Sequence, residues 1–199
     1  LSPHTALGTN KFSSTIGTFT ATVRFIKNRQ IHLRTAVTAA LAALAGSFCG
    51  ARLALAFDEK FLKWMLVVLL PFIALFILTR KNFGEENRVS SISARKQVAL
   101  AATIGFVIGA YDGFFGPGTG SFLILGFTGI LGLDLATAAG NTKIVNLASN
   151  VAAIITFLFG RAVVFALGVP AAVGGILGNW LGSGLAIKNG ARVIKPMFV

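Results

Sequence analysis

One acidic residue, Asp112, lies inside a long apolar stretch that carries no other charge between Gln97 and Leu133. A charged side chain at the centre of a membrane costs about 3 kcal/mol or more on insertion scales, so residues of this kind usually have a function. The carboxylate could carry protons across a membrane, or it could cap a broken helix by accepting hydrogen bonds from backbone N–H groups. The sequence leaves both roles open.

The residues that follow Asp112 are too rich in glycine and proline to continue a helix. Pro117 would end a first half-helix, and the backbone N–H groups at the start of a second half, around Thr119 to Phe122, would attract an anion. The candidate anion site in this run consists of the following residues: Asp112, Gly113, Gly116, Pro117, Gly118, Thr119, Gly120 and Ser121.

The glycines also allow another interpretation. The four-residue spacing of Gly105, Gly109 and Gly113 is typical of close packing between membrane helices. A nucleotide-binding loop is excluded, because no Gly-Lys-Ser/Thr sequence follows the glycines and the dinucleotide pattern is not met at Leu123.

Two lysines, Lys11 and Lys143, each begin a polar stripe on an expected helix. A lysine near the start of a helix is unfavourable to the helix dipole, so its presence in both stripes suggests contact with an anion. The alternative is that both side chains reach the lipid headgroups. The candidate transport residues of the two stripes are Asn10, Lys11, Asn141, Thr142, Lys143 and Asn146, and Ser14, Thr18, Thr22 and Asn150 share the same faces.

The composition is that of a membrane protein. The 199 residues are 55% hydrophobic and only 12% charged, the mean hydropathy is +0.80, and soluble domains carry about 25% charged residues. The formal charge of +12 falls in short clusters between apolar runs, which is typical of cytoplasmic loops rather than of a nucleic-acid-binding face. We therefore expect the lipid bilayer, and no nucleic acid, as a partner.

Sliding the chain by 132 residues aligns residues 1–67 with 133–199 without a gap and gives about 18 identities in the 67 pairs. A duplicated membrane unit explains the match. The chain then divides into two parts. Residues 1–96 are the remainder of a first repeat, with three spans (5–26, 35–57 and 61–79) and a basic cytoplasmic loop at 80–96. Residues 97–199 are the second repeat. The second repeat has a broken helix at 97–133, spans at 135–160 and 162–187, and a last span starting near 193.

The repeats are parallel if segment 97–133 crosses the membrane once, and inverted if it is a re-entrant hairpin of two half-helices. An inverted arrangement places Lys188, Arg192 and Lys195 on the cytoplasmic side, which the positive-inside rule favours. The counterpart of segment 97–133 would precede Leu1, so we expect the chain to be a fragment of a longer transporter.

With these residues the chain resembles the sulfite exporter TauE/SafE family, also called TSUP, and most closely its YfcA-like branch. The run from Tyr111 to Phe122 matches that branch, and Thr9-Asn10-Lys11 and Asn141-Thr142-Lys143 fit its repeated pattern. The resemblance covers essentially the whole chain. It implies a bacterial inner-membrane permease of about eight hydrophobic segments that moves small sulfur-containing or organic anions such as sulfite or sulfonates, although the family's first glycine-rich element is missing here.

We therefore expect an all-α polytopic secondary transporter, which holds an anion near the midplane by the backbone from Gly113 to Ser121 and by Asn10, Lys11, Asn141 and Lys143. No ATP-binding motif is present, so coupling to an ion gradient, with protons as a candidate ion, or to the substrate gradient itself is expected. We expect no catalytic activity, no cofactor and no metal, and a homo-oligomer is open. An anion channel, or a membrane subunit without transport of its own, is the alternative.

Overall fold

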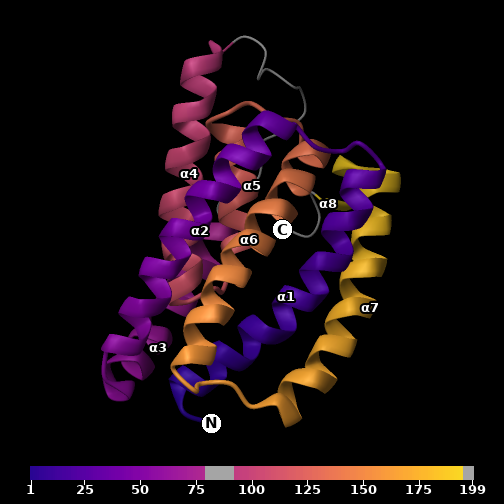
Figure 1. Ribbon diagram of the computed structural model, residues 1–199. Coiled ribbons are helices and arrows are strands. Elements are labelled where there is room, and N and C mark those ends of the chain that lie inside the picture. The colour runs from indigo at the N-terminus through magenta and orange to yellow at the C-terminus, as the bar shows by residue number, and fades with distance from the viewer. Residues whose placement is uncertain (79–91, 195–199) are drawn as a thin grey trace.

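The computed structural model describes residues 1–78 and 92–194. The described residues form helices and no strands, which confirms the predicted all-α fold (Figure 1). The helices are α1 (Pro3–Lys27), α2 (Leu33–Ala56), α3 (Glu59–Leu78), α4 (Ala94–Phe114), α5 (Thr119–Gly129), α6 (Leu135–Phe159), α7 (Phe165–Asn189) and α8 (Ala191–Ile194). Of these, α2, α4, α6 and α7 are long and apolar enough to cross a membrane.

Two of the expected segments are only partly covered. Residues 80–91 of the basic loop predicted at 80–96 lie outside the described residues, and α4 begins at Ala94. The last span predicted from about residue 193 also lies outside them from residue 195 onward.

The sequence repeat is visible in how the helices begin. Ser2 caps α1 by accepting a hydrogen bond from the backbone N–H of Thr5 at 3.4 Å. Asp134, 132 residues later, caps α6 by accepting from the N–H of Thr137 at 3.0 Å. A side-chain oxygen at this position satisfies an N–H that has no partner inside the helix, so the equivalent helices α1 and α6 start by the same means.

The two copies run in opposite directions. In Figure 1, α1 rises from the N-terminus at the bottom while its counterpart α6 descends, and α2 descends while its counterpart α7 rises. The repeats are therefore inverted, as the positive-inside rule predicts.

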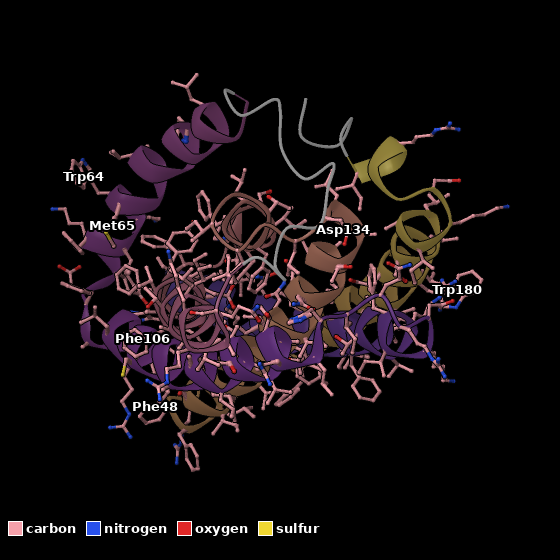
Figure 2. The ribbon with its side chains drawn as sticks, turned by 90° about the horizontal axis from the view of Figure 1, so that it is seen from above. Phe48, Trp64, Met65, Phe106, Asp134 and Trp180 are labelled. Carbon is pink, nitrogen blue, oxygen red and sulfur yellow. The ribbon has the colours of Figure 1, made fainter. Side chains whose placement is uncertain are left out.

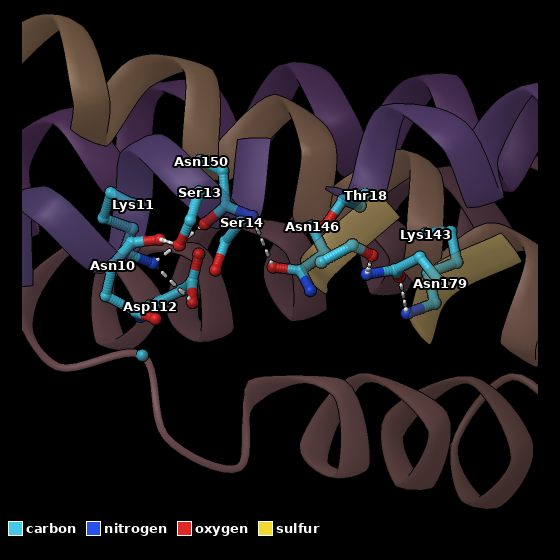
Figure 3. Close-up of a pocket in the computed structure, with 12 residues that line it drawn as sticks. Asn10, Lys11, Ser13, Ser14, Thr18, Asp112, Lys143, Asn146, Asn150 and Asn179 are labelled. Carbon is cyan, nitrogen blue, oxygen red and sulfur yellow. Dashed lines mark hydrogen bonds and ion pairs between the residues drawn. The ribbon is translucent and has the colours of Figure 1, made fainter. Parts of the chain in front are cut away.

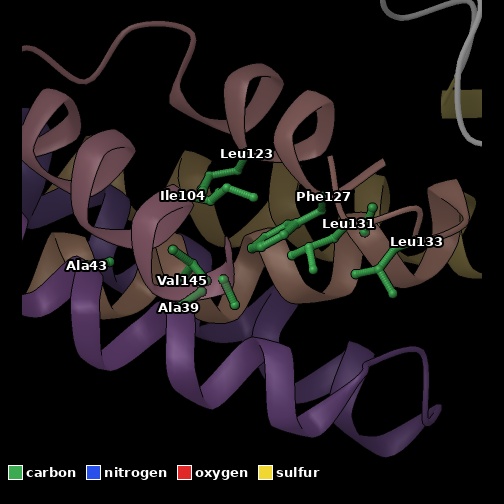
Figure 4. Close-up of a cluster of buried hydrophobic side chains, with 10 residues drawn as sticks. Ala39, Ala43, Ile104, Leu123, Phe127, Leu131, Leu133 and Val145 are labelled. Carbon is green, nitrogen blue, oxygen red and sulfur yellow. The ribbon is translucent and has the colours of Figure 1, made fainter. Parts of the chain in front are cut away.

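The break predicted in segment 97–133 is present between α4 and α5. Gly116 and Gly118 have φ of 93° and 78°, a backbone region that side-chain-bearing residues rarely adopt. α5 then turns back alongside α4 and α6, so the segment is a hairpin and not a single crossing (Figure 1). The apolar face of α5 is buried between these two helices, where Leu123 and Phe127 contact Ile104 and Val145 (Figure 4).

The glycines of α4 make close helix contacts. A Cβ added at Gly105, Gly109 or Gly113 would collide with the α2 backbone, at Ala39, Ala43 and Ser47 in turn. The small-residue interpretation of this spacing therefore describes the contact between α2 and α4.

Each repeat also packs against the other through the loop between its two long helices. A Cβ at Gly8 of α1 would collide with the carbonyl of Ala162, in the α6–α7 loop. At the equivalent place, a Cβ at Gly140 of α6 would collide with the carbonyl of Gln30, in the α1–α2 loop. Such reciprocal contacts are what a two-fold relation between the repeats requires.

Large apolar side chains point outward from the bundle. Phe48, Phe106 and Trp180 lie at its periphery in Figure 2, with 43%, 46% and 53% of their surfaces exposed. The buried set, in contrast, includes Lys11 and Asn150. Apolar groups outside and polar groups inside are expected of a protein surrounded by lipid.

We predict that Asn28 and Asn189 lie on the same side of the membrane and Lys60 on the other, because the inverted repeat places both asparagines at one end of the bundle. Single cysteines at these exposed positions, in a Cys49→Ala background, should show this by labelling with a membrane-impermeant maleimide in sealed vesicles of known orientation. The excess of Lys and Arg near Asn28 and Asn189 predicts that they face the cytoplasm. Labelling of positions 28 and 189 from opposite sides would rule out the inverted arrangement.

Candidate functional site

A polar cavity of about 250 Å³ lies between α1, α4, α6 and α7 (Figure 3). Every residue that lines it is either polar or glycine. The lining residues are Asn10, Lys11, Ser13, Ser14, Thr18, Asp112, Gly116, Lys143, Asn146, Asn150, Gly175 and Asn179.

Helical spacing explains why α1 and α6 contribute most of this lining. Lys11, Ser14 and Thr18 are three and four residues apart on α1, and so are Lys143, Asn146 and Asn150 on α6. Side chains at this spacing share one face of a helix. The two polar stripes predicted from the sequence therefore meet at one cavity.

Lys11 and Asp112 form an ion pair at the cavity wall. Their Nζ and Oδ1 atoms are 2.7 Å apart, and each residue has only 2% of its surface exposed. Lys11 also donates a hydrogen bond to Oδ1 of Asn150 at 3.1 Å. Removing two charges from water is costly, and close pairing with further hydrogen bonds offsets that cost.

Asp112 receives two further hydrogen bonds, both from hydroxyl groups. Thr119 Oγ1, at the start of α5, donates to Oδ1 at 2.8 Å, and Ser149 Oγ of α6 donates to Oδ2. The partners found for this carboxylate among the described residues are thus side chains of three other helices, not the backbone N–H groups of a helix cap. Asp112 joins α4 to α1, α5 and α6.

Lys143 is held differently from its equivalent Lys11. Its Nζ donates a hydrogen bond to Oδ1 of Asn179 at 3.1 Å, and no carboxylate lies within ion-pair distance of it in residues 1–78 and 92–194. Among the described residues, the charged side chains of the cavity wall are therefore two cations and one anion. An unneutralised ammonium beside amide and hydroxyl groups is a natural partner for an anion.

The break after Asp112 contributes less to the cavity than the sequence predicted. Gly116 lines it, whereas Gly113, Pro117, Gly118, Thr119, Gly120 and Ser121 do not. Gly113 packs against Ser47 of α2. The Pro117 carbonyl accepts a hydrogen bond from Tyr111 Oη at 2.5 Å, so Tyr111 closes the break rather than facing the cavity.

Asn141 and Thr142 also lie away from the cavity. Asn141 Oδ1 accepts a hydrogen bond from the backbone N–H of His32 at 2.9 Å. Thr9, its equivalent in the first repeat, accepts one from the N–H of Val164 at 3.0 Å. These two bonds join each repeat to the loop of the other. The buried hydroxyl of Thr142 has no hydrogen-bond partner among the described residues.

Three lining residues were missed by the sequence analysis: Ser13, Gly175 and Asn179. A usable signal existed for Asn179, which is the only side-chain amide in α7 before its last residue. The spacing of the glycines around Asn179 instead indicated close packing between helices. The described part of the chain has no group of three His, Cys, Asp or Glu side chains that could hold a metal ion.

The chain is similar over its whole length to one family of known proteins. The model of the family described as sulfite exporter TauE/SafE matches residues 1–199. "Probable membrane transporter protein ORF9" of Sinorhizobium sp is 37% identical over 197 residues, 99% of this chain and 74% of the relative. "Probable membrane transporter protein YfcA" of Escherichia coli (strain K12) is 34% identical over 199 residues, 100% of this chain and 73% of the relative.

A third relative, "Probable membrane transporter protein" of Haemophilus influenzae, is 34% identical over 197 residues, 99% of this chain and 76% of the relative. No solved structure matches the chain.

We predict that Lys11→Met destabilises the protein by about 3–5 kcal/mol, because it leaves the Asp112 carboxylate buried without its counter-ion. The double variant Lys11→Met/Asp112→Leu, which removes both charges, should recover most of this loss. Unfolding of the purified full-length protein in detergent measures both effects. A single variant as stable as the parent would contradict the buried pair.

Proposed function

The chain belongs to the sulfite exporter TauE/SafE family of membrane transporters, and on this premise we propose that it is a secondary permease for small anions. The observation that carries the proposal is the ammonium of Lys143, which lies in a polar cavity between apolar helices and forms no ion pair with a carboxylate of the described residues. Burying polar groups in this way is costly unless a solute or water satisfies them. An anion is the solute whose charge balances the wall.

The lining favours a small and hydrophilic anion. Amide and hydroxyl groups on α1, α6 and α7 can donate hydrogen bonds to the oxygen atoms of a solute. Within the described parts of the chain, no apolar side chain lines the cavity to receive a large hydrocarbon group. Sulfite, short sulfonates and short carboxylates fit these requirements, and the family's name supports the sulfur-containing members of this set.

The proposal extends to the setting of transport. The bacterial relatives support a multi-pass protein of the bacterial inner membrane, which moves its anion without chemical change and without a cofactor. Protons are the candidate coupling ion, with Asp112 as the buried carboxylate that could bind one.

We predict that Lys143→Met raises the Kd for methanesulfonate by about ten- to a hundredfold, because a hydrogen bond to a charged group contributes about 1.5–3 kcal/mol. The change should leave the stability nearly unaltered, since Lys143 neutralises no described carboxylate. Binding to the purified full-length protein and saturable counterflow in proteoliposomes are the measurements.

Lys188→Met is the matched control, because it removes the same charge from an exposed position of α7 outside the cavity. The control should bind and transport as the parent does. Equal behaviour of the two variants would contradict the role of Lys143, and a conductance without saturable counterflow would contradict a carrier.

A further inference from the structure

We propose that Asp112 is a built-in competitor of the transported anion: an anion that enters the cavity displaces the Asp112 carboxylate from the Lys11 ammonium. The inference rests on the proposed function and adds a specificity-determining role for one residue. It also predicts the charge of the preferred substrate.

The first argument is the position of the pair. Lys11 and Asp112 both line the cavity, and their charged atoms are 2.7 Å apart at its wall. An oxyanion in the cavity presents the same chemistry to Lys11 as Asp112 does, namely negatively charged oxygen atoms that accept N–H hydrogen bonds. The two therefore compete for one ammonium group.

The second argument is that neither residue is left without partners when they separate. Asp112 retains hydrogen bonds from Thr119 and Ser149, neither of which lines the cavity. Lys11 retains its hydrogen bond to Asn150. Because a buried charge without partners is so costly, these remaining donors and acceptors are what makes an exchange of partners feasible.

The third argument is the charge balance of the cavity wall. Lys11 and Lys143 together carry two positive charges and Asp112 carries one negative charge. One monovalent anion neutralises the wall, whereas a divalent anion leaves an excess negative charge at low dielectric, where repulsion is strong. Asp112 thus makes the cavity selective for monovalent oxyanions over divalent ones.

Asp112→Asn tests this directly in the purified full-length protein, with methanesulfonate and sulfate as monovalent and divalent probes of similar size. Releasing Lys11 from its competitor should lower the Kd for methanesulfonate by about tenfold or more, since the binding-competent fraction rises. The Kd for sulfate should fall by a larger factor, because the wall then carries two unopposed cations. Unchanged or weakened binding of both probes would overturn the inference.

Ser149→Ala provides a second test that keeps both charges and stands if Asp112→Asn does not fold. It removes one of the two hydroxyls that hold Asp112 after the exchange, so it should weaken methanesulfonate binding several-fold, opposite in sign to Asp112→Asn. Ser183→Ala is the matched control, because that buried hydroxyl donates to the carbonyl of Trp180 in its own helix. Equal Kd values for the parent, Ser149→Ala and Ser183→Ala would contradict the exchange.

The outcomes separate this inference from the proposed function. If the parent binds neither methanesulfonate nor sulfite, both proposals fail. Suppose instead that the parent binds methanesulfonate and that Lys143→Met weakens this binding. If the Asp112 and Ser149 variants then do not shift the Kd as predicted, only the competitor role of Asp112 fails.

Discussion

The ion pair between Lys11 and Asp112 is the interaction on which the rest of this structure depends. Lipid cannot solvate an ammonium or a carboxylate group, so a chain that carries both at membrane depth must bring them together and complete their hydrogen bonds. Four helices meet for this purpose: α1 and α4 carry the charges, and α5 and α6 supply Thr119, Ser149 and Asn150. The break before α5 is part of the same arrangement, because it turns Thr119 back toward a carboxylate that precedes it by seven residues.

Much of the architecture could be predicted from local signals. The composition indicated membrane helices, the 132-residue repeat indicated duplication, and the glycine-rich run indicated a break, which Gly116 and Gly118 make with left-handed backbone. The polar stripes of α1 and α6 could also be predicted, because helical periodicity depends only on spacing along one element. These properties need no knowledge of which helices become neighbours.

The pairing of distant residues could not be predicted in the same way. Nothing local indicates that Lys11 meets Asp112, or that Lys143 meets Asn179 across 36 residues. Asn141 shows the limit most clearly, since it stands two residues before Lys143 and yet points to the other side of α6, toward His32. Residues two positions apart on a helix lie on nearly opposite faces, and only the packing of the loops showed what Asn141 does.

The contacts at Gly8 and Gly140 hold the two repeats together at both ends of the bundle. The loop after α1 presses on α6 at Gly140, and the loop after α6 presses on α1 at Gly8, at opposite ends of the bundle. Backbone therefore lies directly against backbone at both ends of the bundle, so α1 and α6 cannot move closer to the partner loop at either end without displacing that loop.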